Sequence, residues 1–139
     1  MMITHEVSAE EVLRLFKSAW WTASRDLDGI SRMLSRSDVV FALRVDGRLA
    51  GFARVLSDEV YLALILDVIV SPRLRGTGLG AALMDAIVNH PKVRGARSVE
   101  LVCQPDLMPF YRRWGFTDQV GQSRLMRRTN DPALLTPGP

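Results

Sequence analysis

Residues 64–84, LILDVIVSPRLRGTGLGAALM, decide the fold of this chain because they have the pattern of a strand, a glycine-rich loop and a helix. The residues from Val60 to Val70 are mostly aliphatic or β-branched around a single charge, Asp67, which is typical of a strand buried on both faces. Pro72 ends that strand. Apolar side chains then recur at intervals of three and four after Gly80, which predicts an amphipathic helix.

Three glycines, Gly76, Gly78 and Gly80, lie at the entrance of the predicted helix. Glycine has no Cβ, so the backbone can approach a ligand closely, and the free N–H groups of the first helical turn attract an anion. Arg73 and Arg75 add positive charge beside those donors. The loop therefore predicts a phosphate or pyrophosphate site. A loop that only needs flexibility is the weaker explanation, because each glycine costs roughly 1 kcal/mol in a helix.

Two other phosphate-binding motifs fit this loop less well. A Walker loop requires a lysine after its glycines, and none follows here. The dinucleotide fingerprint is closer, since Gly76, Gly78 and Ala81 match it and Glu100 lies about twenty residues further on. Its glycines follow the strand at once, however, whereas residues 71–75 intervene here, and 139 residues leave little room for a second domain. A dinucleotide-binding protein therefore stays as an alternative.

The composition indicates one compact globular domain, since 47% of the 139 residues are hydrophobic and 24% are charged. We assign this domain to residues 1–128 and expect a flexible tail over residues 129–139, where little can be buried. The formal net charge of +3 comes from 18 basic and 15 acidic residues. That balance favours no nucleic acid partner.

Cysteine use and hydropathy favour a cytoplasmic protein. Cys103 is the single cysteine, which excludes an internal disulfide. Charged residues interrupt the first positions before an apolar segment can form, so we expect no secretory signal. No apolar run approaches the roughly twenty residues that a membrane span needs, and we expect no membrane partner.

Periodicity and turn signals predict the remaining elements. Ser8-Ala9-Glu10-Glu11 is a capping box that starts a first helix, and Asp26 or Asp28 can cap a second helix ending near Ser37. Asp46-Gly47 is the strongest hairpin signal of the chain. Further elements are expected as strands at 3–7, 39–45, 49–56 and 98–103, a basic loop at 92–97, a helix at 106–114, and two closing strands at 116–120 and 123–128.

Two motifs resemble the GCN5-related N-acetyltransferase superfamily. The spacing Arg75-x-x-Gly78-x-Gly80 after a Val-x-Val-Ser-Pro strand end is similar to the acetyl-CoA-binding motif of that family, and residues 110–116, FYRRWGF, resemble its Phe-Tyr-x-x-x-Gly-Phe signature. The resemblance covers roughly residues 1–128, and residues 51–55 and 90–91 are similar to one bacterial branch. It implies an α/β (α+β) fold: a mixed, mostly antiparallel sheet of six to seven strands, flanked by about four helices and splayed at the cofactor site.

The resemblance also implies acetyl-CoA as co-substrate and no metal. In such proteins the backbone of the glycine loop holds the pyrophosphate, the central strand pairs with the pantetheine arm, and a bulge frees a strand N–H for the acetyl oxygen. Gln104 falls where many members have an asparagine near the pantetheine. The residues that this assigns to the cofactor are Val68, Ile69, Val70, Arg75, Gly76, Thr77, Gly78, Leu79, Gly80 and Gln104.

Tyr111 in the second motif is the expected general acid, because a phenol can protonate a thiolate leaving group in a desolvated site. Helical spacing alone favours a place in the core for Tyr111, and the match to the Phe-Tyr-x-x-x-Gly-Phe signature favours the general acid instead. Histone-type members carry a glutamate base at the position of Leu64, so that role does not transfer. Asp67 is the expected catalytic carboxylate, with a purely structural role as its alternative; Asp58, Glu59 or a water chain could also serve as the base.

Trp20, Trp21 and Arg25 lie in the segment that, by resemblance, forms one wall of the acceptor site. The aromatic rings could pack against a cationic amine and Arg25 could bind an acceptor carboxylate, with core packing as the alternative. We therefore predict an N-acetyltransferase that moves an acetyl group directly to the primary amine of a small molecule or peptide, in a ternary complex. A CoA-binding sensor without catalysis is the alternative within the same fold. A homodimer through a sheet edge is possible.

Overall fold

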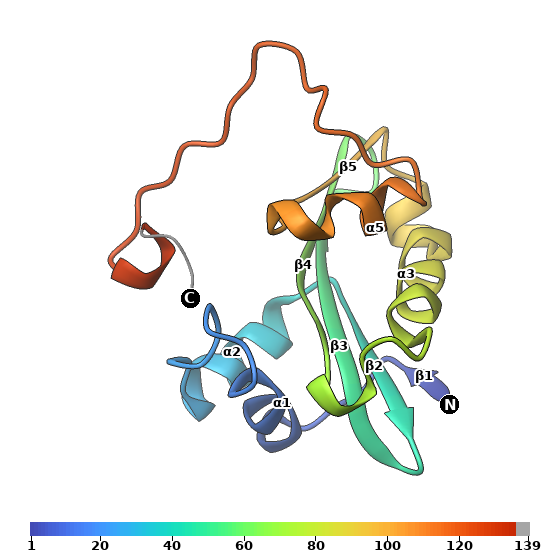
Figure 1. The fold of residues 1–139 in the computed structure, drawn as a ribbon, viewed down its shortest axis with the longest axis vertical. Helices are drawn as coiled ribbons and strands as arrows, with labels where there is room; N and C mark the ends of the chain where they lie inside the picture. The colour runs from blue at the N-terminus through green and yellow to red at the C-terminus, as the bar shows by residue number, and fades with distance from the viewer. Residues whose placement is uncertain (136–139) are drawn as a thin grey trace. The chain divides into compact units, whose positions relative to one another are not determined.

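The computed structural model describes residues 1–135, which fall into two compact units that divide after Leu101. The first unit is a five-stranded sheet with helices on both faces (Figure 1). Its strands are β1 (Met2–Thr4), β2 (Val39–Val45), β3 (Arg48–Ser57), β4 (Leu62–Val70) and β5 (Ser98–Leu101). Its helices are α1 (Ala9–Phe16), α2 (Leu27–Arg36), the short 3-10 helix η1 (Pro72–Leu74), α3 (Leu79–Asn89) and α4 (Pro91–Arg94).

The strands lie in sequence order, β1-β2-β3-β4-β5. The first four are antiparallel neighbours, and β5 pairs parallel to β4 after the crossover through α3. The predicted hairpin joins β2 and β3, where Asp46 and Gly47 both have positive φ, 52° and 78°. Two successive positive φ angles suit a type I′ turn, which matches the twist of the flanking strands. The expected fold class is confirmed.

The two faces of the sheet are covered by different helices. On one face, α1 packs against β3 and β4 through a group of buried apolar residues, the α1 cluster, which includes Phe16, Phe52 and Ile69. On the other face α3 lies over β2, β3 and β4, close enough that a Cβ at Gly51 would meet the Leu83 side chain at 3.7 Å. The central strands are therefore buried on both sides, as their apolar sequences predict.

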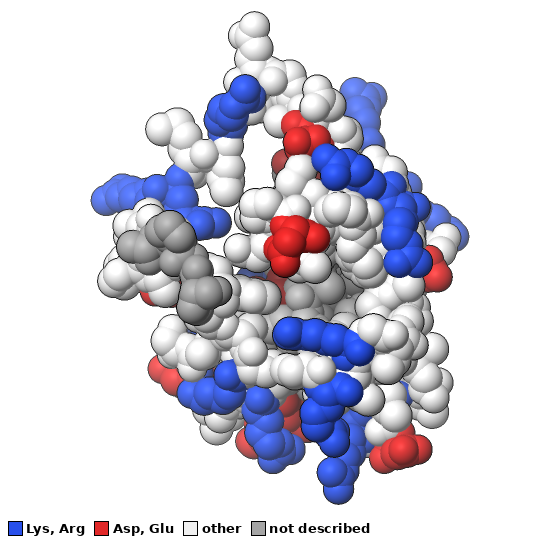
Figure 2. Space-filling view, viewed as in Figure 1, with Lys and Arg blue, Asp and Glu red and all other residues white. Residues whose placement is uncertain are grey.

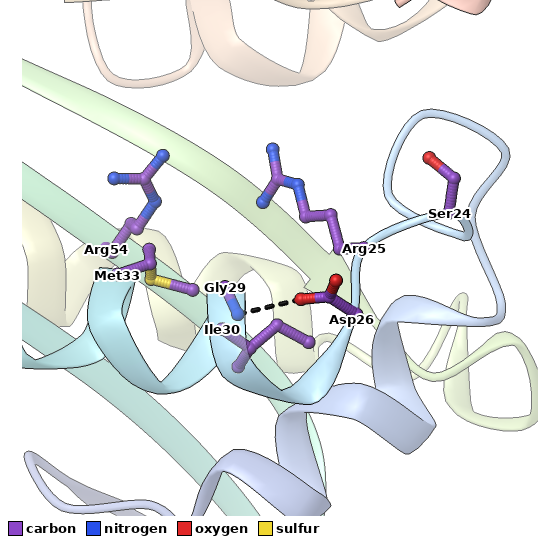
Figure 3. A pocket seen from close by; sticks show the side chains of 7 residues that line it. All are labelled: Ser24, Arg25, Asp26, Gly29, Ile30, Met33 and Arg54. Carbon is purple, nitrogen blue, oxygen red and sulfur yellow. Dashed lines mark hydrogen bonds between the residues drawn. The ribbon is translucent and has the colours of Figure 1, made fainter.

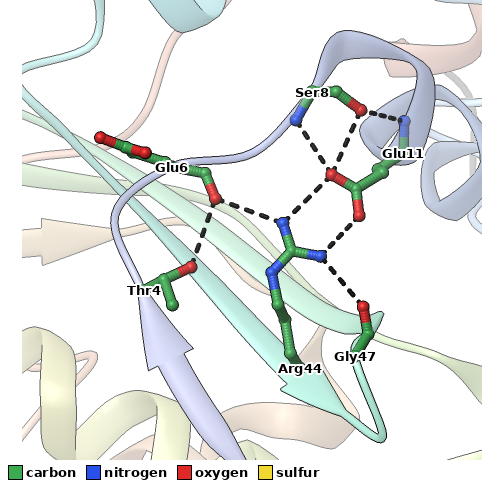
Figure 4. Close-up of polar contacts among 6 residues, drawn as sticks. All are labelled: Thr4, Glu6, Ser8, Glu11, Arg44 and Gly47. Atoms are coloured by element: carbon green, nitrogen blue, oxygen red, sulfur yellow. Dashed lines mark hydrogen bonds and ion pairs between the residues drawn. The ribbon is translucent and has the colours of Figure 1, made fainter.

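The N-terminus of α1 is held by the predicted capping box and by an arginine from β2. The Glu11 N–H donates to Ser8 Oγ and the Ser8 N–H donates to Glu11 Oε1, at 3.2 and 3.1 Å. Arg44 donates to both Glu11 carboxylate oxygens, at 2.5 and 3.1 Å, and to the carbonyl oxygens of Glu6 and Gly47 (Figure 4). The arginine thus joins α1, the segment before it and the hairpin turn.

The second unit, described to residue 135, contains η2 (Pro105–Leu107), α5 (Met108–Arg112) and η3 (Pro132–Leu134). The closing strands expected at 116–120 and 123–128 are wrong: these residues form no strand. Most of their side chains are exposed, Val120, Leu125 and Met126 included, so the segment buries too little apolar surface to specify a register. The sheet consequently has five strands rather than six or seven among the described residues.

Smaller differences concern the lengths of elements. The helix expected at 106–114 is a 3-10 turn followed by the short α5, and the loop expected at 92–97 begins as α4, which His90 caps by accepting the Lys92 N–H. Of the tail predicted at 129–139, residues 132–134 form η3 and residues 136–139 lie outside the described residues.

Charged side chains are interspersed over the face seen in Figure 2, where Lys and Arg lie among Asp, Glu and uncharged residues. That distribution agrees with the small net charge of +3. Among residues 1–135, no helix is both long and apolar enough to cross a bilayer.

Candidate functional site: a glycine loop, a bulged strand and an arginine pocket

The glycine loop is exposed and its conformation requires glycine. Gly76 and Gly78 have φ angles of 80° and 84°, in the left-handed region, and Gly78 is the N-cap of α3. A Cβ at either position would meet nothing within 4 Å, so backbone conformation rather than packing selects glycine there. No side chain caps α3, so the N–H groups of its first turn have no side-chain acceptor at the positive end of the helix.

The side chains around this loop are mostly exposed. Arg73 and Arg75 are exposed, and the Thr77 hydroxyl donates to the Leu74 carbonyl oxygen, which ties the loop to η1. Leu79 and Gly80 are partly exposed in the first turn of α3. Backbone N–H groups, a helix N-terminus and nearby arginines are what a pyrophosphate needs for binding.

Next to the loop, β4 carries a bulge and loses one neighbour. In the pairing with β3, Phe52 lies opposite Ile69 and Arg54 lies opposite Leu66, so β4 has one more residue than β3 over this interval. Asp67 lies within it and has a φ of 57°, a conformation that costs energy for a residue with a Cβ. The bulge expected at the cofactor site is therefore present.

The pairing of β4 with β5 covers only residues 62–65 and ends where β5 ends, at Leu101. Within residues 1–101, the second half of β4 thus has a strand neighbour on one side alone. Ile69 is 3% exposed and packs into the α1 cluster, whereas Val68 and Val70 are partly exposed. An extended ligand can lie along such a strand and pair with its main chain.

The Asp67 carboxylate binds two arginines. Arg25 Nη1, from the α1–α2 connection, and Arg54 Nε, from β3, both donate to Asp67 Oδ2, at 2.7 and 2.6 Å. The Asp67 side chain is 7% exposed, against 35% for Arg25 and 17% for Arg54. Burial alone would raise the pKa of Asp67, but the hydrogen bonds and charges of the two arginines outweigh it and leave the pKa below its usual value. A carboxylate with a lowered pKa is a weak base.

The same two arginines line a pocket of about 330 Å³ (Figure 3). Its wall comes from the α1–α2 connection, from the first turns of α2 and from β3: Ser24, Arg25, Asp26, Gly29, Ile30, Met33 and Arg54. Asp26 caps α2, because its Oδ1 accepts the Gly29 N–H at 2.8 Å. The pocket thus combines two guanidinium groups with an apolar wall, next to the bulge of β4.

Of the three residues predicted for the acceptor wall, the structure places Arg25 in this pocket but not the two tryptophans. The rings of Trp20 and Trp21 pack edge to face, with their centres 5.7 Å apart, and Trp21 packs against the α1 cluster. The Arg25 guanidinium also lies 5.1 Å from the centre of the Phe16 ring. Core packing therefore explains Trp21, whereas Arg25 has a polar role.

Tyr111 and Gln104 belong to the second unit. Tyr111 is 7% exposed, with its ring edge to face against Phe110 and Phe116, at 5.0 and 6.3 Å. Burial raises its pKa to about 12, with a smaller contribution from Cys103. The phenol is therefore protonated at neutral pH, as a general acid must be, but the raised pKa also makes it a weaker proton donor. Gln104 is exposed at the start of η2.

The other predicted bases, Asp58 and Glu59, lie in the turn before β4. Asp58 Oδ1 accepts the N–H groups of Val60, Tyr61 and Leu62, which closes the turn before β4 and lowers the pKa of Asp58. Glu59 is exposed in the same turn. Among residues 1–135, no group of three or more His, Cys, Asp or Glu side chains is arranged to hold a metal ion.

Sequence reasoning missed Arg54, although a signal for it was present. Residues 49–56 form an apolar strand with one charge, Arg54, and the neighbouring strand also has one charge, Asp67. Two lone opposite charges in adjacent buried strands predict an ion pair, because each would otherwise be buried without a partner.

A family model described as an acetyltransferase (GNAT) domain matches residues 3–128. The uncharacterized N-acetyltransferase ycf52 of Porphyra purpurea is 32% identical over 117 residues, which cover 81% of this chain and 67% of that protein. Serotonin N-acetyltransferase 2, chloroplastic, of Oryza sativa subsp. japonica is 35% identical over 96 residues, which cover 66% of this chain and 48% of that protein. The chain thus matches about half to two thirds of the length of these relatives.

Among solved structures, the chain is similar to a protein of Xanthomonas campestris pv. campestris that is assigned to the GNAT family of acetyltransferases. The TM-score is 0.81 and the sequence identity is 32%, with 92% of both chains covered. Because the likeness extends over nearly the whole chain, it concerns the loop, the bulged strand and the helices around them together.

Proposed function

The chain belongs to the GNAT family of acetyltransferases, and we propose that it binds acetyl-CoA at the glycine loop and transfers the acetyl group directly to a primary amine in a ternary complex. The observation that carries this proposal is the N-terminus of α3, which no side chain caps, behind two glycines of positive φ. Within residues 1–101 it lies next to a strand, β4, whose second half pairs with a neighbouring strand on one side alone. The first feature suits a pyrophosphate and the second an extended pantetheine arm.

In the proposed reaction the amine nitrogen attacks the thioester carbonyl carbon, the C–S bond breaks, and the thiolate takes up a proton. The Val68 N–H, next to the bulge, would donate to the carbonyl oxygen as charge develops on it. Tyr111 would supply the proton to the thiolate, since its phenol carries that proton at neutral pH. Because its pKa of about 12 lies above that of a thiol, roughly 8.5, this proton transfer is uphill by itself and is driven by the breakdown of the thioester. Gln104 is proposed to contact the pantetheine.

Asp67 enters this proposal as a residue that positions others. Its carboxylate has a lowered pKa and holds Arg25 and Arg54, so it is poorly suited to take the proton of the attacking amine. We assign that proton to a water chain. We also propose the cytoplasm as the compartment, although some of the relatives are named as chloroplastic.

The cofactor site is tested by a thermal-shift titration with acetyl-CoA, CoA, NADH and ATP. A ligand at about a hundred times its dissociation constant adds roughly 2.7 kcal/mol to stability, so binding is easily seen. Stabilisation by acetyl-CoA and CoA alone supports the proposal, and stabilisation by NADH alone contradicts it.

Two glycine variants show whether the loop is the binding site. Gly78→Ala and Gly47→Ala place a Cβ at positive φ angles of 84° and 78°, and neither Cβ meets an atom within 4 Å. Both should cost about 1 kcal/mol of stability. Only Gly78→Ala should also weaken CoA binding, because its Cβ and the strained backbone disturb the pyrophosphate donors. Equal CoA affinity in the two variants would move the cofactor elsewhere.

Turnover tests the role of Tyr111. Thiol release that depends on an added amine distinguishes an acetyltransferase from a CoA-binding sensor. With an amine that supports it, Tyr111→Phe should lower kcat by about a hundredfold or more, with CoA affinity unchanged. Full turnover in that variant at every pH would remove Tyr111 from the mechanism.

A further inference from the structure

We propose that the pocket between the α1–α2 connection and β3 binds an anionic group of the acceptor, so that the preferred substrate is an amine that also carries a carboxylate or a phosphate. This inference rests on the proposed acetyl transfer. It concerns which amine is used, which the family membership leaves open.

The first argument is the number of unused donors in the pocket. A guanidinium has five N–H groups, and Arg25 and Arg54 each give only one to Asp67. Within residues 1–135 the two side chains make no other hydrogen bond, and no buried side-chain nitrogen or oxygen there lacks a partner. The remaining N–H groups are therefore accessible. Both arginines line the pocket, so these donors are available to a ligand inside it (Figure 3).

The second argument is the charge. Asp67 is 7% exposed and lies behind the two guanidinium groups, and these three groups together carry one positive charge. Asp26 is the acidic residue of the lining, but it is exposed and one of its oxygens caps α2. Solvent screens its charge more than it screens Arg54, which is 17% exposed. A carboxylate or phosphate fits the paired guanidinium forks better than a neutral group does.

The third argument is preorganisation. Asp67 holds Arg25 and Arg54 in place through a single oxygen, so their side chains are ordered before a ligand arrives. The apolar wall of Ile30 and Met33 can cover a short carbon chain. Asp67 directly precedes Val68, so the two arginines that it holds lie at the same point along β4 as the proposed acetyl position.

The test compares matched pairs of amines on the CoA-saturated protein. Each pair differs only in the anionic group: an amino acid against its carboxamide, and an aminoalkyl phosphate against the corresponding amino alcohol, on several carbon chains. Binding is measured by calorimetry and transfer by thiol release with acetyl-CoA. The acidic member of at least one pair should bind roughly tenfold to a hundredfold more tightly and have a correspondingly higher kcat/KM. A preference in the amino acid pairs indicates a carboxylate as the anionic group, and a preference in the aminoalkyl phosphate pairs indicates a phosphate.

Variants then assign the preference to the pocket. Arg54→Gln and, separately, Arg25→Lys should abolish most of the preference, since the first removes a charge and the second keeps the charge but loses the planar fork. Arg32→Gln is the matched control, because Arg32 is 67% exposed on α2, which also carries Ile30 and Met33 of the pocket, and it pairs with Asp28. It should retain the full preference. A CoA-induced thermal shift in each variant shows that the fold is intact.

The outcomes separate this inference from the proposed function. If the protein binds no CoA, the proposed function fails. If CoA binds but neutral amines bind or react as well as their acidic partners, or no acidic amine binds at all, the anionic pocket is wrong and the cofactor site stands. A preference that survives in both arginine variants also overturns it.

Discussion

Glu11 and Asp67 are both carboxylates that pair with arginine, and they differ in how many N–H donors their arginine partners leave unused. At the start of α1, Glu11 receives two hydrogen bonds from Arg44, which also donates to the carbonyl oxygens of Glu6 and Gly47. At the bulge of β4, Asp67 receives one hydrogen bond from each of Arg25 and Arg54. The first arginine is used within the protein, whereas the other two keep most of their donors for the pocket.

This difference teaches how a structural ion pair can be told from a binding site. Arg44 connects a helix, the preceding segment and a hairpin, so its geometry is explained by the fold alone. Asp67 has a left-handed backbone conformation in the middle of a strand and a carboxylate that is 7% exposed, both of which cost free energy. A strained residue with buried charge beside unused donors is more typical of a functional site.

The largest effect is expected from Asp67→Asn. The substitution keeps the shape of the side chain and its tolerance for positive φ, but leaves two guanidinium groups without their counter-charge. Loss of one partner from a buried pair costs about 3 kcal/mol or more, and the partial exposure of Arg25 should reduce this to roughly 2 kcal/mol. Urea unfolding measures this. Without the Asp67 charge the two guanidinium groups carry two positive charges but are no longer held in place, so the CoA-saturated variant should also change its preference for acidic amines. A variant with unchanged acceptor selectivity would show that Asp67 does not position the arginines.

Glu11→Gln should have a smaller effect, and on stability alone. Glutamine can still accept the Ser8 N–H in the capping box, but it loses the charged contact with Arg44. We expect a loss of about 1 kcal/mol by urea unfolding, with kcat/KM for any amine unchanged. A change in acceptor selectivity would mean that the Glu11–Arg44 cluster is coupled to the cluster of Asp67, Arg25 and Arg54. Arg44 would then have more than a structural role.

The pH dependence of stability provides another comparison of the two clusters. The Arg44 hydrogen bonds, the Ser8 N–H and the nearby charge lower the pKa of Glu11 from 4.5 to about 2 in the folded protein. Its contribution to stability is therefore fully present above pH 4.5 and is lost as the pH falls toward 2. Asp67 contributes with the same sign, since its folded pKa is also lowered.

Unfolding free energies measured from pH 6 to pH 2.5 should consequently fall in the wild type, and fall less steeply in Glu11→Gln. The steepness should also decrease in Asp67→Asn. If either variant kept the wild-type slope, the missing carboxylate would not have a lowered pKa in the folded protein.

The sequence predicted the elements whose apolar pattern and turn residues agree. The strand before the glycine loop, the Asp46-Gly47 hairpin and the capping box at Ser8 each carry their own local signal, and all three are present. Residues 116–120 and 123–128 were predicted as strands on either side of Gly121, but they have few apolar side chains, and a strand also needs a partner and a register, which local pattern does not provide. Their strands were therefore predicted wrongly.

The candidate site was predictable in part for the same reason. Glycine loops and helix starts are local, so the loop at Gly76 and Gly78 could be recognised from spacing. Arg54 is thirteen positions from Asp67 and Arg25 is forty-two, so their meeting depends on strand register and on the path of the α1–α2 connection. Only the folded chain shows that both arginines bind the same oxygen and face the same pocket.

The smallest effect is expected at an ion pair that belongs to neither cluster. Arg32 and Asp28 face each other at 3.4 Å on one turn of α2, with both side chains largely exposed, at 67% and 81%. Such pairs contribute at most about 0.5 kcal/mol, and salt screens them. Arg32→Gln should therefore change the unfolding free energy by less than that amount and leave acceptor selectivity intact. If it lowered selectivity as Arg54→Gln does, a general positive field around α2 would be the cause, rather than the two guanidinium groups held by Asp67.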